Sequence, residues 1–142
     1  MPGGSAGATP PRTTDLPDER SARRAVAAAT AVASAGVLVA PVLRFRARRT
    51  TVDPRPGDAP SALVTDGLND RTRNPMYVGM AGVLLAHALW WGRARTLAPL
   101  VGFAAWMDRV QIPDEEAALR ARFLADFEAY ATRVPRWLVT LR

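Results

Sequence analysis

An uncharged apolar stretch flanked by arginines constrains this chain most. Residues 25–43 read AVAAATAVASAGVLVAPVL, 19 residues without a charged side chain. A helix of that length, at about 1.5 Å per residue, is about 28 Å long and matches a hydrocarbon core of about 30 Å. The stretch therefore predicts a transmembrane helix. Arginines bound it on both sides: Arg23 and Arg24 before it, and Arg44, Arg46, Arg48 and Arg49 after it.

A cleaved export signal is the alternative interpretation of the same stretch. Basic residues precede an Ala-rich run, and Ala33, Ser34 and Ala35 form an A-x-A cleavage pattern. However, the apolar run continues to Leu43, and the arginines that follow would resist translocation. We favour an uncleaved anchor.

The charge of the chain raises the question of nucleic acid. The formal net charge is +6, the sequence pI is about 11.3, and every basic residue is an arginine. Phosphate contacts depend on such residues. Here, however, the arginines stand at the ends of apolar runs rather than along one polar helix, so we expect a membrane partner and no nucleic acid. The absence of cysteine and the single histidine exclude disulfides, Cys-based metal sites and multi-histidine sites, and we expect no metal.

The rest of the chain divides by composition. Residues 1–23, rich in Gly, Pro, Ser and Thr, predict a disordered polar tail, and residues 24–142 one membrane domain. A connector over residues 44–74 carries Pro54, Pro56, Gly57 and Pro60 and predicts a loop. Two further apolar runs, residues 75–91 and 97–112, predict helices of marginal length for spanning, so a soluble helical hairpin remains an alternative.

The last predicted helix covers residues 115–134, with Asp114 as its N-cap and Pro135 ending it. It is amphipathic, with one apolar face made by Leu119, Phe123, Phe127, Tyr130 and Val134. We expect it to lie on the membrane or to cover the hairpin. The predicted fold class is all-α: an integral membrane bundle of about three transmembrane helices and a C-terminal amphipathic cytoplasmic helix.

Two local patterns favour the membrane for the hairpin. Trp90 and Trp91 end the second run, as an interfacial aromatic belt does. Small residues four apart would let the two hairpin helices pack closely in lipid. These pairs are Gly82 with Ala86, and Ala98 with Gly102.

The arginine distribution predicts an orientation. The connector carries seven arginines, against Arg93 and Arg95 in the turn between the second and third runs. By the positive-inside rule the connector is cytoplasmic and the N-terminal tail is outside. The start of the second helix and the segment after the third then converge at the cytoplasmic face. We expect a multi-pass protein of a bacterial-type plasma membrane.

Two separated motifs carry a resemblance to a known family. The first is R-N-P-x-Y-x-G, with Arg73, Asn74, Pro75, Tyr77 and Gly79, followed after the apolar runs by Glu115 and Glu116. The second is the closing RFLADFEAYATRVPRWL. Both resemble the membrane methyltransferases that include isoprenylcysteine carboxyl methyltransferases and phospholipid N-methyltransferases. This chain departs from them with asparagine at Asn74, where histidine is frequent, and with Leu124 and Phe127, where glycine and tyrosine are usual.

The resemblance implies S-adenosylmethionine as cofactor and a lipophilic methyl acceptor, either a prenylated carboxylate or a phospholipid amine. It leaves the catalytic residues unassigned and implies that the residues of the first motif bind the cofactor: Arg73, Asn74, Pro75, Tyr77, Gly79, Glu115 and Glu116. Arg73 suits the cofactor's carboxylate, Glu115 or Glu116 its ammonium or ribose, and Tyr77 its cationic centre. We do not take His87 as a general base, because it lies far along the helix from Asn74. A non-catalytic membrane protein that keeps the fold as an interaction module is the alternative function.

Overall fold

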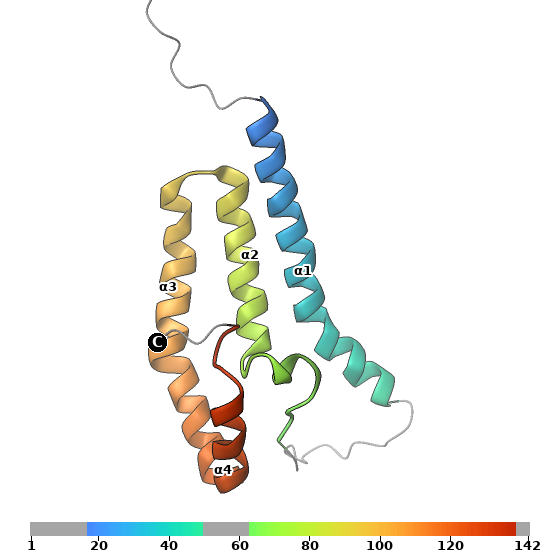
Figure 1. The fold of residues 1–142 in the computed structure, drawn as a ribbon, viewed down its shortest axis with the longest axis vertical. Helices are drawn as coiled ribbons and strands as arrows, with labels where there is room; N and C mark the ends of the chain where they lie inside the picture. The colour runs from blue at the N-terminus through green and yellow to red at the C-terminus, as the bar shows by residue number, and fades with distance from the viewer. Residues whose placement is uncertain (1–16, 50–62, 139–142) are drawn as a thin grey trace, which may run out of the picture.

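The computed structural model describes residues 17–49 and 63–138, and the side chains of residues 18–43 and 63–138. The described residues form helices and no strand, which confirms the all-α class (Figure 1). Two short 3-10 helices, Gly67–Asp70 and Ala94–Leu97, and a π-helical turn, Met107–Gln111, complete the order. The four long helices are α1 (Pro17–Arg49), α2 (Pro75–Trp91), α3 (Ala98–Trp106) and α4 (Ile112–Arg133).

Helix α1 is longer than the sequence predicted at both ends. It begins at Pro17, so residues 17–23 belong to the helix and not to the polar tail, and residues 1–16 lie outside the described part. Asp18 and Glu19 in its first turn favour this early start, because carboxylates stabilise a helix N-terminus. The helix also continues through residues 44–49, where we predicted loop. Arginine is a good helix former, and no glycine or proline stands in that segment to end it.

Helix α2 has the predicted bounds. Pro75 occupies its first turn, where the missing N–H is no loss. Gly92 ends it in the left-handed conformation, with φ 62°, and donates its N–H to Ala88 O at 2.9 Å. Helix α2 runs antiparallel to α1 and packs along it, and α3 returns antiparallel to α2 (Figure 1).

Glycines of α2 face α1 rather than α3. A Cβ on Gly79 would lie 2.9 Å from Leu38 Cγ, and one on Gly82 would overlap the Ser34 hydroxyl. A Cβ on Gly102 of α3 would meet nothing within 4 Å. The prediction that Gly82 and Gly102 bring the two hairpin helices together is therefore wrong, because the close approach is between α1 and α2.

The third and fourth predicted helices form one continuous helical path. The chain passes from α3 through the π-helical turn into α4 without a break, so Ile112 already begins the last helix. Asp114 lies inside its first turn, and the prediction that it caps the helix is wrong. At Leu124 the backbone leaves helical geometry, with φ 45° and ψ −116°, and the last part of α4 turns back along the first (Figure 1).

The hydrophobic core lies at this turned end of the molecule. Phe127, Tyr130 and Val134 are buried there, with Phe127 only 1% exposed. Leu119 and Phe123 pack against them, so the apolar face predicted for the last helix is confirmed as one cluster. It also takes in Leu63, from the segment that leads to α2, and therefore joins the end of the chain to its middle.

The long helices themselves leave much apolar surface uncovered. The Asp18–Leu43 part of helix α1 is long and apolar enough to cross a membrane. In its most apolar 18 residues, 11% are buried. No other described helix passes the same test of length and composition. Exposed large apolar residues nevertheless occur along α2 and α3 as well, among them Val83, Leu85, Trp90, Val101 and Trp106.

Candidate functional site

The R-N-P-x-Y-x-G segment and the Glu115–Glu116 pair meet where α2 and α4 begin. Arg73, two residues before α2, places Nη1 3.0 Å from Glu116 Oε1 in the first turns of α4. Tyr77, in the first turn of α2, donates its hydroxyl to Glu115 Oε1 at 2.6 Å. The predicted convergence of these segments at one end of the hairpin is confirmed. The helical path through α3 and the π-helical turn produces it, because that path returns the chain to the level at which α2 starts.

Glu116 is the buried centre of the cluster. Its side chain is 5% exposed, and Arg136 donates to both of its oxygens, from Nε at 3.0 Å and from Nη2 at 2.8 Å. Arg120, one helical turn later, lies 3.6 Å from Glu116 Oε2 at the solvent side. A buried carboxylate needs such partners, because an unpaired charge in a low-dielectric interior is unstable. Glu116 therefore links the start of α2, α4 and the C-terminal segment.

Arg136 comes from the segment that follows α4. The hydrogen bonds to Glu116 raise the pKa of its guanidinium above the ordinary value, although burial opposes this. Asp108 adds a second carboxylate 3.6 Å from Arg136 Nη1, and Trp137 Nε1 donates to the same Asp108 at 3.2 Å. Arg136 is thus fixed as a cation between two carboxylates.

A strap of hydrogen bonds ties this segment to the start of α2. Arg73 donates its N–H to Pro135 O at 2.9 Å, and Thr72 donates its hydroxyl to Arg136 O at 2.7 Å. The Asn74 side-chain amide also donates to Arg136 O, at 3.1 Å. Asn74 is therefore engaged in holding the C-terminal segment, a structural role that the sequence did not indicate.

A second polar pair, Tyr77 and Glu115, lies outside the buried cluster. Glu115 is exposed and receives two hydrogen bonds, one from Tyr77 and one from Gln111 Nε2 at 2.9 Å. Tyr77 is half-buried, and neither Glu115 nor Tyr77 takes part in the buried cluster. Beside them, Arg73 keeps two buried nitrogens, Nε and Nη1, that make no well-oriented hydrogen bond within residues 17–49 and 63–138.

The remaining predicted site residues have other positions. Pro75 begins α2 and orders the chain there without contributing a polar group. Gly79 is buried against Leu38 and Val37 of α1, so its role is helix packing and not ligand contact. His87 is exposed, with its ring centroid 6.3 Å from that of Trp91, and borders a pocket with Arg93 near the far end of α2.

Sequence reasoning did not assign several residues that build the cluster. Two of them had usable signals: Arg136 lies in the closing V-P-R motif, and Asp108 is an acidic residue in an otherwise apolar run. The contributions of Thr72, Gln111 and Trp137 depend on the path of the chain and left no local signal. The described residues contain no group of three or more His, Asp or Glu side chains that could hold a metal ion.

Comparison with known proteins gives one relationship. The chain is 32% identical over 63 residues to a protein of Haemophilus influenzae described as an uncharacterized protein. The matched region is 44% of this chain and the whole length of that relative. The chain belongs to the same family as the Haemophilus influenzae protein. No family model matches the chain, and no solved structure does. The description of the relative states no activity, so a function must be argued from the cluster itself.

Proposed function

We propose that this protein is an integral membrane methyltransferase that uses S-adenosylmethionine and acts on a lipophilic acceptor. The observation that carries the proposal is the meeting of the two motif segments around Arg73 and Glu116, 3.0 Å apart. Groups that are distant in the sequence form one polar cluster at the end of an otherwise apolar hairpin. A zwitterionic, cationic ligand requires such a mixture of cation, carboxylate and aromatic hydroxyl.

The side chains suit the parts of this cofactor. The Arg73 guanidinium fits its carboxylate, because Nε lacks a hydrogen-bond partner among the described residues while Nη1 pairs with Glu116. Exposed Glu115 fits its ammonium, and Tyr77 offers a hydroxyl and a ring face to a cation. S-adenosylmethionine supplies a methyl group already activated by its sulfonium. The protein then has to align donor and acceptor and exclude water.

In this proposal the two glutamates have different roles. Glu116 is buried, and its carboxylate oxygens are paired with Arg73 and Arg136. Its role in the proposal is to hold these two arginines in place. Glu115 is exposed and is therefore the carboxylate that we assign to the ligand. The sequence motif alone left these two glutamates equivalent.

The proposal includes three membrane spans, α1, α2, and α3 with the π-helical turn. Support comes from the uncovered apolar side chains of all three helices and from the length of α1. Apolar residues go round α2 and α3 instead of forming one stripe, a pattern typical of helices surrounded by lipid. The acceptor is then held by its acyl or prenyl chain, at about 0.8 kcal/mol per buried methylene, with its head group at the level of Tyr77.

In the proposed orientation the cluster faces the cytoplasm. Arg71, Arg73 and the last turns of α1, residues 44–49, lie toward this end. The orientation predicted from the sequence rested on comparing these arginines with Arg93 and Arg95 only. Because α1 is antiparallel to α2, Arg20, Arg23 and Arg24 share the opposite end with those two. The excess of arginines at the proposed cytoplasmic end over the opposite end is therefore smaller than a count of the connector alone indicates.

One observation favours a non-catalytic role. The charges of Glu116, Arg136 and Asp108 are matched to one another, as in a structural clamp that joins the chain end to α2. A membrane protein that keeps this clamp as an interaction module would need no cofactor. Cofactor binding separates the two functions.

The test is isothermal titration of the detergent-purified protein with S-adenosylmethionine. We expect saturable binding, weakened about tenfold or more in Glu115→Gln, because a charged hydrogen bond contributes about 1.5–3 kcal/mol. His87→Ala is the matched control and should bind like the parent. Absence of binding by the parent would favour the interaction module.

The acceptor is tested with membranes that contain the overexpressed protein and a radiolabelled methyl donor. Label should enter a product that extracts into organic solvent, and it should not do so with the Tyr77→Ala, Glu115→Ala double variant. Label found only in water-soluble small molecules would contradict the lipophilic acceptor and leave the methyltransferase activity standing.

A further inference from the structure

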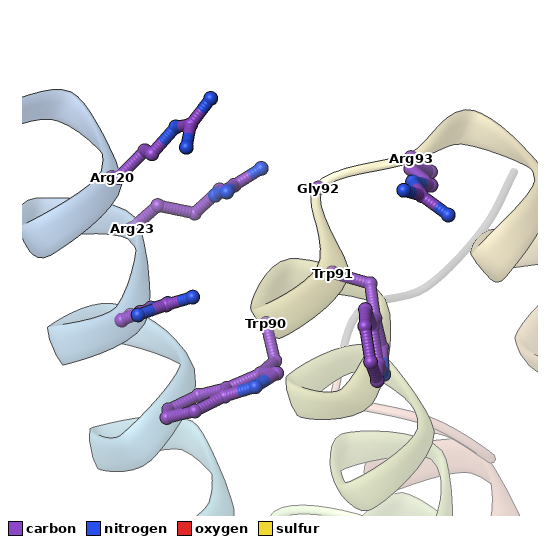
Figure 2. A pocket seen from close by; sticks show the side chains of 7 residues that line it. Arg20, Arg23, Trp90, Trp91, Gly92 and Arg93 are labelled. Carbon is purple, nitrogen blue, oxygen red and sulfur yellow. The ribbon is translucent and has the colours of Figure 1, made fainter. Parts of the chain in front are cut away.

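A basic pocket lies at the end of the molecule opposite the Glu116 cluster. Its volume is about 440 Å³, and it lies between the first turns of α1 and the C-terminus of α2 (Figure 2). Arginines from both segments line it together with two tryptophan side chains. These residues are Arg20, Arg23, Arg24 and Arg93, with Trp90 and Trp91.

Gly92 allows this pocket to form. Its backbone is left-handed, with φ 62°, and a Cβ there would overlap the Arg23 guanidinium. Arg23 therefore reaches across the end of α2, as Figure 2 shows. Its Nε is buried and has no hydrogen-bond partner within the part of the chain that the structure describes. A buried guanidinium nitrogen of this kind requires an acceptor.

Ordinary structural roles account for part of the cluster only. Arg24 lies over the Trp90 ring, 5.2 Å from its centroid, which is a cation–π contact. The C-terminus of α2 attracts a cation through the helix dipole, which accounts for Arg23 or Arg93. Neither effect explains why both Arg23 and Arg93 converge on one hollow beside Arg24, since like charges repel. The acidic residues of the first turn of α1, Asp18 and Glu19, do not line the pocket.

We propose that this pocket binds a phosphate group. Phosphate brings negative charge into this basic pocket, and its oxygens match the planar donor fork of guanidinium. The Arg23 Nε gains an acceptor, and Trp90 and Trp91 give the pocket an apolar edge for an attached chain. A lipid head group and a soluble phosphate share this chemistry. The site is independent of the methyltransferase proposal, because none of its residues belongs to the Glu116 cluster.

The experiment is calorimetric titration of the detergent-purified chain in phosphate-free buffer. The probes are a short-chain phosphatidic acid below its micelle concentration, the diacylglycerol with the same chains, and inorganic phosphate. We expect the phosphatidic acid to bind and the diacylglycerol not to bind. Equal affinity for inorganic phosphate would identify a soluble source, and an affinity lower by about a hundredfold would identify a lipid.

Variants connect the binding to the pocket. Arg23→Gln with Arg93→Gln should weaken phosphatidic acid binding about tenfold or more, since two charged donors are removed. Arg93→Gln alone alters an exposed side chain, so it tests the pocket without disturbing the packing of α1 on α2. Arg122→Gln, exposed on α4, is the control and should bind like the parent. Unchanged binding in both pocket variants, or no binding of any phosphate compound by the parent, would overturn the proposal.

Discussion

Replacing Glu116 with glutamine tests whether the buried cluster holds the fold together. Glutamine keeps the shape but removes the charge that Arg73 and Arg136 share, at 3.0 and 2.8 Å. Loss of one partner from a buried pair costs about 3–5 kcal/mol. Arg136 is 33% exposed and can regain water, so we expect the lower end, about 3 kcal/mol of the free energy of unfolding.

Glu128→Gln is a matched control, because both glutamates contact Arg120. Glu128 is 57% exposed and lies 2.7 Å from Arg120 Nε, so its loss should cost about 0–1 kcal/mol. The measurement is thermal unfolding of the detergent-purified proteins, followed by circular dichroism. If Glu116→Gln were no more destabilising than Glu128→Gln, the cluster would be a surface feature without structural weight, and the reasoning would fail.

Three further predictions follow from the packing and can be measured in the same unfolding assay. Tyr130→Phe removes the hydroxyl that donates to Asn69 O at 2.8 Å and should cost about 0.5–1.5 kcal/mol, and a loss near zero would show that this bond is not made. Leu124→Gly should leave stability equal or higher, because φ 45° favours glycine and the leucine is 69% exposed; a loss of about 1 kcal/mol, as in a regular helix, would contradict the turn. Gly82→Val should be strongly destabilising and Gly102→Val nearly neutral, because only the first meets another helix; equal effects would refute the α1–α2 contact.

The sequence predicted the helices well where apolar runs had clear ends. Pro75 and Gly92 mark the bounds of α2, and both signals act locally. The ends of α1 were missed because charged residues in a helix resemble charged residues in a loop. The continuity from α3 to α4 was missed because Pro113 and Asp114 are equally suited to a cap and to a first helical turn.

The candidate site was predictable in part for a related reason. The resemblance named both Arg73 and Glu116, and the topology required their segments to share one end. The motif could not distinguish Glu115 from Glu116, because burial decides their roles and burial depends on where Arg136 returns. It also marked Leu124 as standing where glycine is usual. The backbone there gives the reason, since φ 45° is the region that glycine adopts most readily.

The strap between residues 72–74 and 135–136 sets an order of events during synthesis. Helices α1, α2 and α3 are synthesised before Pro135 and Arg136, so they can pair while Thr72 and Asn74 still lack their partners in the C-terminal segment. The Glu116 carboxylate likewise lacks its Arg136 partner until that residue has been synthesised. The cluster is therefore completed last, after the apolar helices, and a chain that ends before Pro135 would lack both the strap and the Arg136 partner of Glu116.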